Sequence, residues 1–190
     1  MGSWGSTNHP LQNKMTDIYY CENIISKQEL LPIYDMLMTQ SWSLGSAYAG
    51  QKTYSDTYAS NRIFSEGQSF NPFLTGFFSG IAGNVNRKLR EKYNWQLPVH
   101  KIHRIQMNAQ KKGNAFDFHQ DGSPDMYSMI GFFTPEWQDN WGGQLQIEGD
   151  TIPFKPGDFV VFRSNYLHDA MPIIEDMPWY RISVGMFFQP

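Results

Sequence analysis

The second half of the chain, from Val99 onward, consists of short segments in which apolar and polar residues alternate. Alternation with a period of two is typical of strands that bury one face. Glycines and prolines at 142–143, 148–150 and 155–157 supply the turns between the segments. We expect strands near 101–108, 115–120, 126–134, 143–147, 151–154, 158–163, 167–170 and 180–188. This pattern predicts a mainly β fold with an antiparallel barrel or sandwich, not a parallel α/β sheet.

Two helices are predicted before this region. Ser26 and Glu29 have the spacing of a capping box, which predicts a helix over about 26–40. Asn71 followed by Pro72 is a typical start for a second helix, over about 72–92, which carries a wide apolar stripe. Both helices are expected to support one face of the sheet.

The length and composition fit one folded domain. A chain of 190 residues with 41% apolar residues can bury a sizeable core. We interpret residues 1–16 as a flexible leader and 17–190 as a single domain. The region 41–70 is rich in Ser, Tyr, Gly and Asn, and we expect strands and loops near the mouth of the site, either as a substrate-contacting segment or as ordinary surface turns.

Charge and cysteine content limit the classes of binding partner and the cellular compartment that we expect. The net charge is −3 and no long basic run occurs, which argues against a sequence-independent nucleic-acid surface. No apolar stretch is long enough to cross a membrane. Cys21 is the single cysteine, so an internal disulfide is excluded and a reducing, cytoplasmic location is expected.

The candidate chemistry is concentrated at His119 and Asp121. On an extended segment these two side chains point to the same face. An imidazole and a carboxylate projected together are two of the three ligands in a 2-His-1-carboxylate triad, which binds Fe(II) and leaves other positions open. A lone His-x-Asp occurs in many chains, so the pattern gains its weight from residues further along the chain.

His168 lies 47 residues after Asp121, and Arg181 follows 13 residues later in the pattern Arg-x-Ser. The run 131–137, followed by Trp141-Gly-Gly-Gln-Leu145, adds a further signature. Together these motifs, over about 102–188, resemble the Fe(II)/2-oxoglutarate-dependent oxygenases, particularly their prolyl-4-hydroxylase-like group.

The resemblance implies a double-stranded β-helix, or jelly-roll, and a metal site formed by His119, Asp121 and His168. It implies Fe(II) as the metal, 2-oxoglutarate and O₂ as cosubstrates, and ascorbate as a supporting reductant. The implied reaction is hydroxylation of a C–H bond, with conversion of 2-oxoglutarate to succinate and CO₂.

Four further residues are predicted to contact the cosubstrate. Alternation along 180–188 places Arg181 and Ser183 on one face, where a buried guanidinium needs an anionic partner such as a dicarboxylate. The family often adds a polar group from neighbouring strands, and here Ser128 and Asn108 occupy the matching segments.

The substrate class stays open. Peptidyl proline is favoured, but Met186 and Phe187 stand where prolyl hydroxylases often carry a tryptophan. Another protein side chain, a small molecule, a nucleic-acid dealkylase or a jelly-roll binding module without catalysis are alternatives. The dealkylases usually carry a second arginine, and nothing basic comes after Arg181. The sequence leaves the physiological substrate and the oligomeric state undetermined.

Overall fold

The protein is described from a computed structural model, which covers residues 17–44, 46–48, 51–53, 57–113 and 117–190, with backbone alone for 46–48 and 51–53. The predicted leader, 1–16, lies outside the described residues. The elements in chain order are β1 (Ile18–Cys21), α1 (Lys27–Met38), β2 (Ser43–Leu44), β3 (Ser46–Tyr48), β4 (Gln51–Thr53), β5 (Tyr58–Ser65), β6 (Gln68–Ser69), α2 (Pro72–Tyr93), β7 (Ile102–Gln110), β8 (Tyr127–Phe132), a 3-10 turn (Asp139–Trp141), β9 (Leu145–Ile147), β10 (Asp150–Ile152), β11 (Phe159–Arg163), β12 (His168–Ala170) and β13 (Arg181–Phe188).

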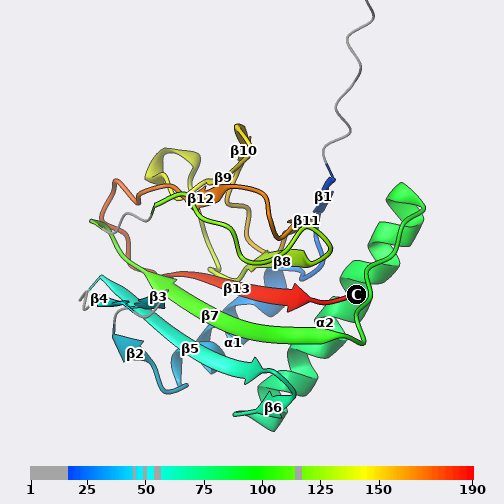
Figure 1. The fold of residues 1–190 in the computed structure, drawn as a ribbon. Coiled ribbons are helices and arrows are strands. Elements are labelled where there is room, and N and C mark those ends of the chain that lie inside the picture. Colours follow the sequence, from blue (N-terminus) through cyan, green and yellow to red (C-terminus); the bar gives the residue numbers. More distant parts are fainter. Residues whose placement is uncertain (1–16, 45, 49–50, 54–56, 114–116) are drawn as a thin grey trace, which may run out of the picture.

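Two antiparallel sheets form the core of the molecule (Figure 1). Within the described residues, the main sheet has the order β1-β11-β8-β13-β7-β5-β2, with β6 paired to β5. The smaller sheet has the order β10-β9-β12 and lies over one face of the main sheet. The strand pattern predicted an antiparallel barrel or sandwich and the resemblance implied a jelly-roll, and this mainly β fold class is confirmed.

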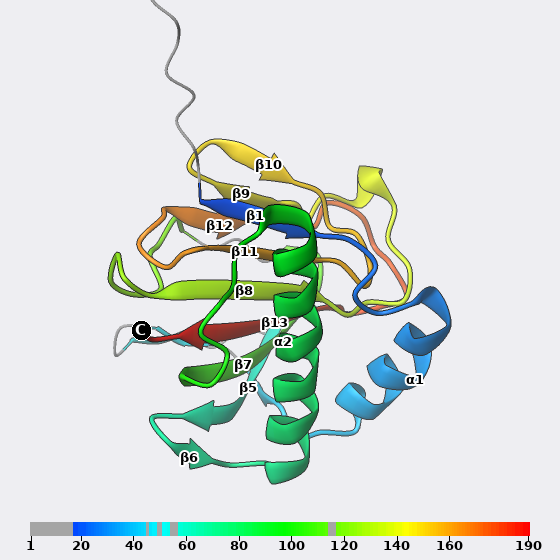
Figure 2. The ribbon, with the colours of Figure 1, turned by 90° about the vertical axis from the view of Figure 1, so that its right-hand side faces the viewer.

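Both predicted helices are present and cover the other face of the main sheet (Figure 2). Asn71 caps α2, where its side-chain oxygen accepts a hydrogen bond from the Leu74 amide at 3.0 Å. At the start of α1, the Glu29 carboxylate accepts from the Ser26 amide at 2.9 Å. The capping residues therefore set where each helix begins.

The main sheet separates two apolar cores. One lies between the sheet and the helices and includes Phe78 of α2 with Val161 and Val184 of the sheet. The other lies between the two sheets and includes Val160 and Phe162 of β11. Successive residues of β11 therefore enter opposite cores, as the pleat of a strand requires. Burying one such side chain contributes about 1.5–3 kcal/mol.

Two segments differ from the sequence-based expectation. Only 117–120 of the predicted strand at 115–120 is described, and there His119 alone forms a bridge, to His168. The region 41–70 contributes β5, whose eight residues pair along β7 as an integral part of the main sheet. The sequence of β5 is too polar to show this, because one of its faces carries partly exposed residues.

Candidate metal and cosubstrate site

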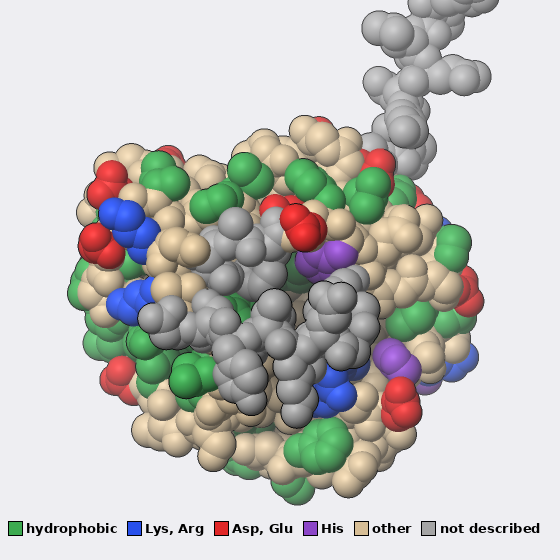
Figure 3. All heavy atoms as spheres, turned by 60° about the vertical axis from the view of Figure 1, so that its left-hand side comes forward, with side chains coloured by type: hydrophobic (Ala, Val, Ile, Leu, Met, Phe, Trp, Pro, Cys, Tyr) green, Lys and Arg blue, Asp and Glu red, His purple; other side chains and the backbone are tan. Residues whose placement is uncertain are grey.

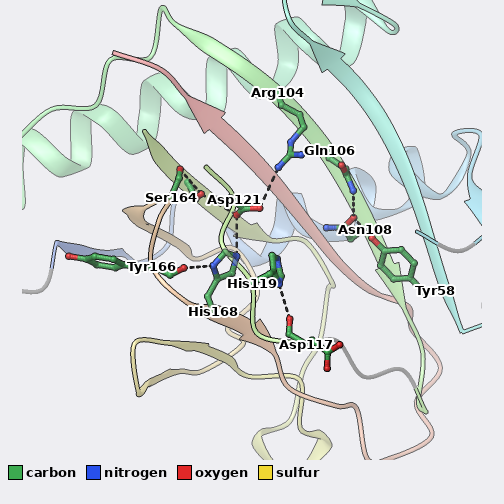
Figure 4. A network of polar contacts seen from close by, with 11 residues as sticks. Tyr58, Arg104, Gln106, Asn108, Asp117, His119, Asp121, Ser164, Tyr166 and His168 are labelled. Atoms are coloured by element: carbon green, nitrogen blue, oxygen red, sulfur yellow. Dashed lines mark hydrogen bonds and ion pairs between the residues drawn. The ribbon is translucent and has the colours of Figure 1, made fainter. Parts of the chain in front are cut away.

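Backbone pairing brings the predicted metal ligands together. His119 and His168 exchange two backbone hydrogen bonds, each 3.0 Å long, so the segment before β8 is tied to β12. The Asp121 amide donates to the Ser164 carbonyl at 2.8 Å, which fixes the next turn of the chain. These contacts bring the two ligand segments side by side, and Figure 4 shows the side chains of His119, Asp121 and His168 near one another.

The three side chains form a cluster suited to a metal ion. One ligand atom from each of His119, Asp121 and His168 lies within 4.8 Å of the others. The two imidazole rings lie 4.4 Å apart between centroids, and the His168 Nε2 lies 3.1 Å from the Asp121 Oδ2. The structure therefore assembles the triad that the sequence predicted.

The other ring nitrogens determine which atoms face the metal. The His119 Nδ1 lies 2.9 Å from the Asp117 carbonyl, and the His168 Nδ1 lies 2.9 Å from the Tyr166 carbonyl. A carbonyl can only accept, so each Nδ1 donates its proton there and each Nε2 is the atom left to bind a metal, once His168 has released the proton that it shares with Asp121. Two neutral nitrogens and one carboxylate oxygen are a donor set that fits Fe(II).

Burial makes the charges of the cluster interdependent. His168 is 3% exposed, and the Asp121 side chain is 7% exposed. Burial alone would raise the pKa of Asp121, but the hydrogen bond and charge of His168, with Arg104 and His119, hold that pKa below its usual value. Burial opposes the charged form of His168, yet the bond to Asp121 raises its pKa above the usual 6.5. A metal ion would take the place of the shared proton.

Arg181 is a buried cation at the start of β13, and the charge of Asp169, the residue after His168, acts on it. It is 2% exposed, and its Nε donates to the Gly143 carbonyl at 3.0 Å. Its Nη1 contacts the Gln110 side chain, and its guanidinium lies 4.7 Å from the centre of the Phe154 ring. Burial lowers the pKa of Arg181 to about 10, against the opposing charge of Asp169, so it stays charged at neutral pH. The prediction of a buried arginine on β13 is confirmed.

The glycine pair at 142–143 shapes this pocket. Gly143 has a φ of +72°, and a Cβ there would approach the Trp137 ring to 2.8 Å and the Arg181 Cδ to 3.1 Å. The Trp137 Nε1 in turn donates to the Gly142 carbonyl at 3.0 Å. The Trp and Gly-Gly motifs of the sequence therefore serve to place a backbone carbonyl against the guanidinium.

Among the described residues, no carboxylate lies within ion-pairing distance of Arg181. A buried charge without a counter-charge is costly, and a bound anion would offset that cost. Ser183 is buried on the same face of β13, two residues from Arg181. Its contact with a cosubstrate stays a prediction.

Ser128 and Asn108 have partners of their own. Ser128 Oγ donates to the Asp121 Oδ2 at 3.1 Å and lies 2.9 Å from the Ser164 Oγ, so it helps to fix the orientation of the Asp121 carboxylate. Asn108 accepts from the Tyr58 hydroxyl at 2.6 Å and from the Gln106 amide at 3.1 Å (Figure 4). Their predicted contacts with the cosubstrate stay predictions.

Two functional positions were missed by the sequence reasoning. Arg104 points toward Asp121, and Gln110 contacts Arg181. Both lie on β7 at even spacing with Gln106 and Asn108, so one strand carries a row of polar side chains. That two-residue period was the signal that could have identified them. On the face shown in Figure 3, histidine and acidic side chains lie side by side at the surface, and hydrophobic side chains lie near them.

Known proteins share this fold. Residues 102–189 match the model of the 2OG-Fe(II) oxygenase superfamily. A prolyl-4-hydroxylase from Pseudomonas putida superimposes with a TM-score of 0.65 at 14% identity, over 93% of this chain and 94% of that one. A prolyl hydroxylase from Trichoplax adhaerens, in complex with a peptide of the hypoxia inducible factor oxygen degradation domain, gives 0.62 at 14% identity, over 92% and 84%.

HygX from Streptomyces hygroscopicus, with nickel, 2-oxoglutarate and hygromycin B bound, gives a TM-score of 0.64 at 8% identity, over 92% of this chain and 83% of that one. At such identities the structural matches establish the fold alone. No curated protein sequence matches this chain significantly. Neither helix in the described part of the chain is long and apolar enough to span a membrane. The segment that matches the family model, residues 102–189, contains the complete His-x-Asp…His triad, and this part of the chain is therefore identified as the catalytic region of a 2OG-Fe(II) oxygenase, an oxidoreductase.

Proposed function

We propose that this oxygenase hydroxylates a prolyl residue of a polypeptide, coupled to decarboxylation of 2-oxoglutarate to succinate and CO₂. The observation that carries the reaction class is the combination of the triad with the buried Arg181. Fe(II), with 2-oxoglutarate and O₂, would supply the oxidation that inserts one oxygen atom into the C–H bond, and ascorbate would keep the metal reduced between turnovers.

The metal would be bound by His119, His168 and Asp121. Both Nε2 atoms are available because the Nδ1 atoms donate to backbone carbonyls. Asp121 contributes one negative charge, which partly neutralises a divalent ion in a buried site. The task of these residues is to fix the ligand directions before metal arrives, and the bridge between His119 and His168 does so.

The far carboxylate of 2-oxoglutarate would pair with Arg181. Among the described residues, the charge of Asp169 acts on the guanidinium but no carboxylate forms an ion pair with it, and the Gly143 carbonyl and Gln110 hold the guanidinium in a fixed orientation. Ser183 would add a hydroxyl donor to the same carboxylate. Charge-assisted bonds of this kind contribute roughly 1.5–3 kcal/mol each.

Two relatives of the same fold, from Pseudomonas putida and Trichoplax adhaerens, are prolyl hydroxylases, which supports peptidyl proline as the substrate. A second candidate is a polar small molecule. HygX, which was solved with hygromycin B, has a similar TM-score. The polar row of Arg104, Gln106 and Asn108 beside the triad, in place of an apolar wall, favours that alternative.

The test is hydroxylation of a proline-rich peptide by the protein with Fe(II), 2-oxoglutarate, ascorbate and O₂, followed by mass spectrometry. We expect peptide carrying one added oxygen atom and stoichiometric succinate, and no product from a peptide with alanine in place of proline. Asp121→Ala should abolish the product. The exposed Asp125, whose carboxylate accepts a hydrogen bond from the Ser123 hydroxyl, provides the control Asp125→Ala, which should retain the product.

Succinate formation without peptide oxidation would reject proline but keep the reaction class. Product from Asp121→Ala would contradict the assignment of the metal ligands.

A further inference from the structure

We propose that Arg104 is a positioning residue for the metal carboxylate: it holds the Asp121 Oδ1 so that the Oδ2 alone faces the metal. The inference rests on the metal site of the proposed function, but it concerns how that site is built. Arg104 lies on β7, outside the His-x-Asp…His motif, and nothing in the motif requires a cation at this place.

The two oxygens of Asp121 have separate surroundings. The Oδ2 lies 3.1 Å from the His168 Nε2 and accepts a hydrogen bond from Ser128 at 3.1 Å. The Oδ1 faces the Arg104 Nη2, at 3.4 Å, on the other side (Figure 4). One oxygen is therefore directed toward the histidines and the other toward a cation. Rotation of the carboxylate would bring Oδ2 toward the guanidinium and break both of its contacts.

Arg104 is itself held in place by the neighbouring strand. It is the direct cross-strand partner of Phe187 on β13, and its guanidinium carbon lies 3.9 Å from the centre of the Phe187 ring. The ring folds back over Gly185, where a Cβ would approach the Phe187 Cζ to 2.9 Å. A small residue at 185 thus allows the ring to lie flat, and the ring supports the guanidinium. Stacking of this kind restricts a long side chain and contributes about 0.5–2 kcal/mol.

The consequence concerns the open positions of the metal. A carboxylate that binds through both oxygens occupies one more coordination position than a carboxylate that binds through one. By engaging Oδ1, Arg104 would keep Asp121 to a single bond and leave that position free for cosubstrate or water. Arg104 also acts on the affinity for the metal. A cation near the site repels a divalent ion, so removal of Arg104 would by itself strengthen metal binding.

The test uses Mn(II) bound to the protein without 2-oxoglutarate or substrate, so that its outcome is independent of hydroxylation. Water-proton relaxation reports how many waters the bound ion carries. We expect Arg104→Met to lower the relaxivity of bound Mn(II) by roughly a third, since one of about three open positions of a six-coordinate ion is then filled by Oδ1. Arg104→Gln keeps an N–H donor and should restore most of the relaxivity.

Phe187→Leu removes the platform and should change relaxivity in the same direction as Arg104→Met, by less. The double variant should give no more than Arg104→Met alone, because both changes act through one contact. Lys92→Met is the matched control, since Lys92 lies on α2, which covers the face of the main sheet opposite the smaller sheet that contains His168, and it pairs with Glu22 just after β1. It should leave relaxivity unchanged.

Wild-type relaxivity in Arg104→Met, with Mn(II) bound as tightly as before or more tightly, would overturn the proposal. If Arg104→Met does not fold, Phe187→Leu decides in its place: wild-type relaxivity of Mn(II) bound to Phe187→Leu would overturn the proposal. Lowered relaxivity in Arg104→Met, with an unchanged melting temperature, supports positioning, because loss of charge repulsion alone would change the affinity for Mn(II) and not the number of waters that the bound ion carries.

Discussion

The short contact between His168 and Asp121 links metal binding to pH. The bond to Asp121 raises the pKa of His168 above 6.5, and a metal must displace the proton that the two residues share. Below the raised pKa, Mn(II) or Fe(II) competes with that proton. Above it, the His168 Nε2 is free and affinity no longer depends on this group.

We therefore expect metal affinity to rise by up to about tenfold per pH unit on the acid side of the His168 pKa, and then to level off. Calorimetric titration with Mn(II) at several pH values, in two buffers of different ionisation enthalpy, measures both affinity and proton release. An affinity that is flat between about pH 6 and pH 8, with no proton released, would contradict the shared proton.

In the metal-free protein, the same two pKa shifts make the stability of the folded state depend on pH. A raised histidine pKa stabilises the folded state below the unfolded value of 6.5, and this contribution is lost as the pH rises through the folded pKa. The lowered pKa of Asp121 stabilises above 3.8 and is lost on acidification through its folded pKa. The pair thus stabilises the apo protein in the window between these two losses.

Helix α2 is stabilised both by signals in its local sequence and by packing against the main sheet. Its cap, its apolar stripe and its basic end were readable from the sequence, and the helix spans Pro72–Tyr93 against an expected 72–92. The stripe is effective because Leu74, Phe78 and Val85 are buried against the sheet. Glycines on the opposite face contribute nothing to this packing.

Gly76, Gly80 and Gly83 of α2 are exposed, and a Cβ at any of them would meet no atom within 4 Å. Replacing all three by alanine should raise the free energy of unfolding by about 2–3 kcal/mol, from helix propensity alone. Urea denaturation measures the change. The reverse substitution Ala82→Gly, at a buried position, should destabilise, and a triple variant no more stable than wild type would show that α2 is not limited by its glycines.

Alternation of apolar and polar residues in the sequence identifies some of the strands but not others. In β13, Arg181 and Ser183 alternate with the apolar residues Ile182 and Val184. The strand and the buried arginine could therefore both be predicted. A strand was expected within 41–70, but the place of β5 in the main sheet, between β7 and β2, could not be predicted because its residues are largely polar. The segment of His119 could not be assigned either: one bridge replaces a regular strand there. Arg104 depends on a cross-strand pairing with Phe187, which local sequence does not encode.

In the molecule as a whole, the main sheet separates the apolar core beside the helices from the apolar core between the two sheets, and only the second of these contacts a residue of the triad. Phe78 packs between helix and sheet against Phe133, at 5.6 Å between ring centres. Phe162 lies in the core between the sheets and contacts the His168 ring edge-on, at 4.9 Å. The two cores should therefore respond differently to the same kind of substitution.

Phe78→Ala and Phe162→Ala should each lower the free energy of unfolding by about 3–5 kcal/mol. Under conditions where both variants stay folded, Phe78→Ala should bind Mn(II) like wild type, whereas Phe162→Ala should bind it several-fold more weakly, because His168 loses the ring that orients it. Denaturation curves and metal titrations distinguish the two. Equal losses of metal affinity in both variants would show that the cores are not separate.

The central claim is that the triad and Arg181 act together on one metal-bound 2-oxoglutarate. Its most direct test is an anaerobic titration of the apo protein with Fe(II) and 2-oxoglutarate, in which a weak visible charge-transfer band reports chelation of the metal by the keto acid. We expect the band in wild type and its marked weakening in Arg181→Ala at the same 2-oxoglutarate concentration, with Fe(II) still bound. Iron binding without any band, or a band of equal strength in Arg181→Ala, would contradict the account.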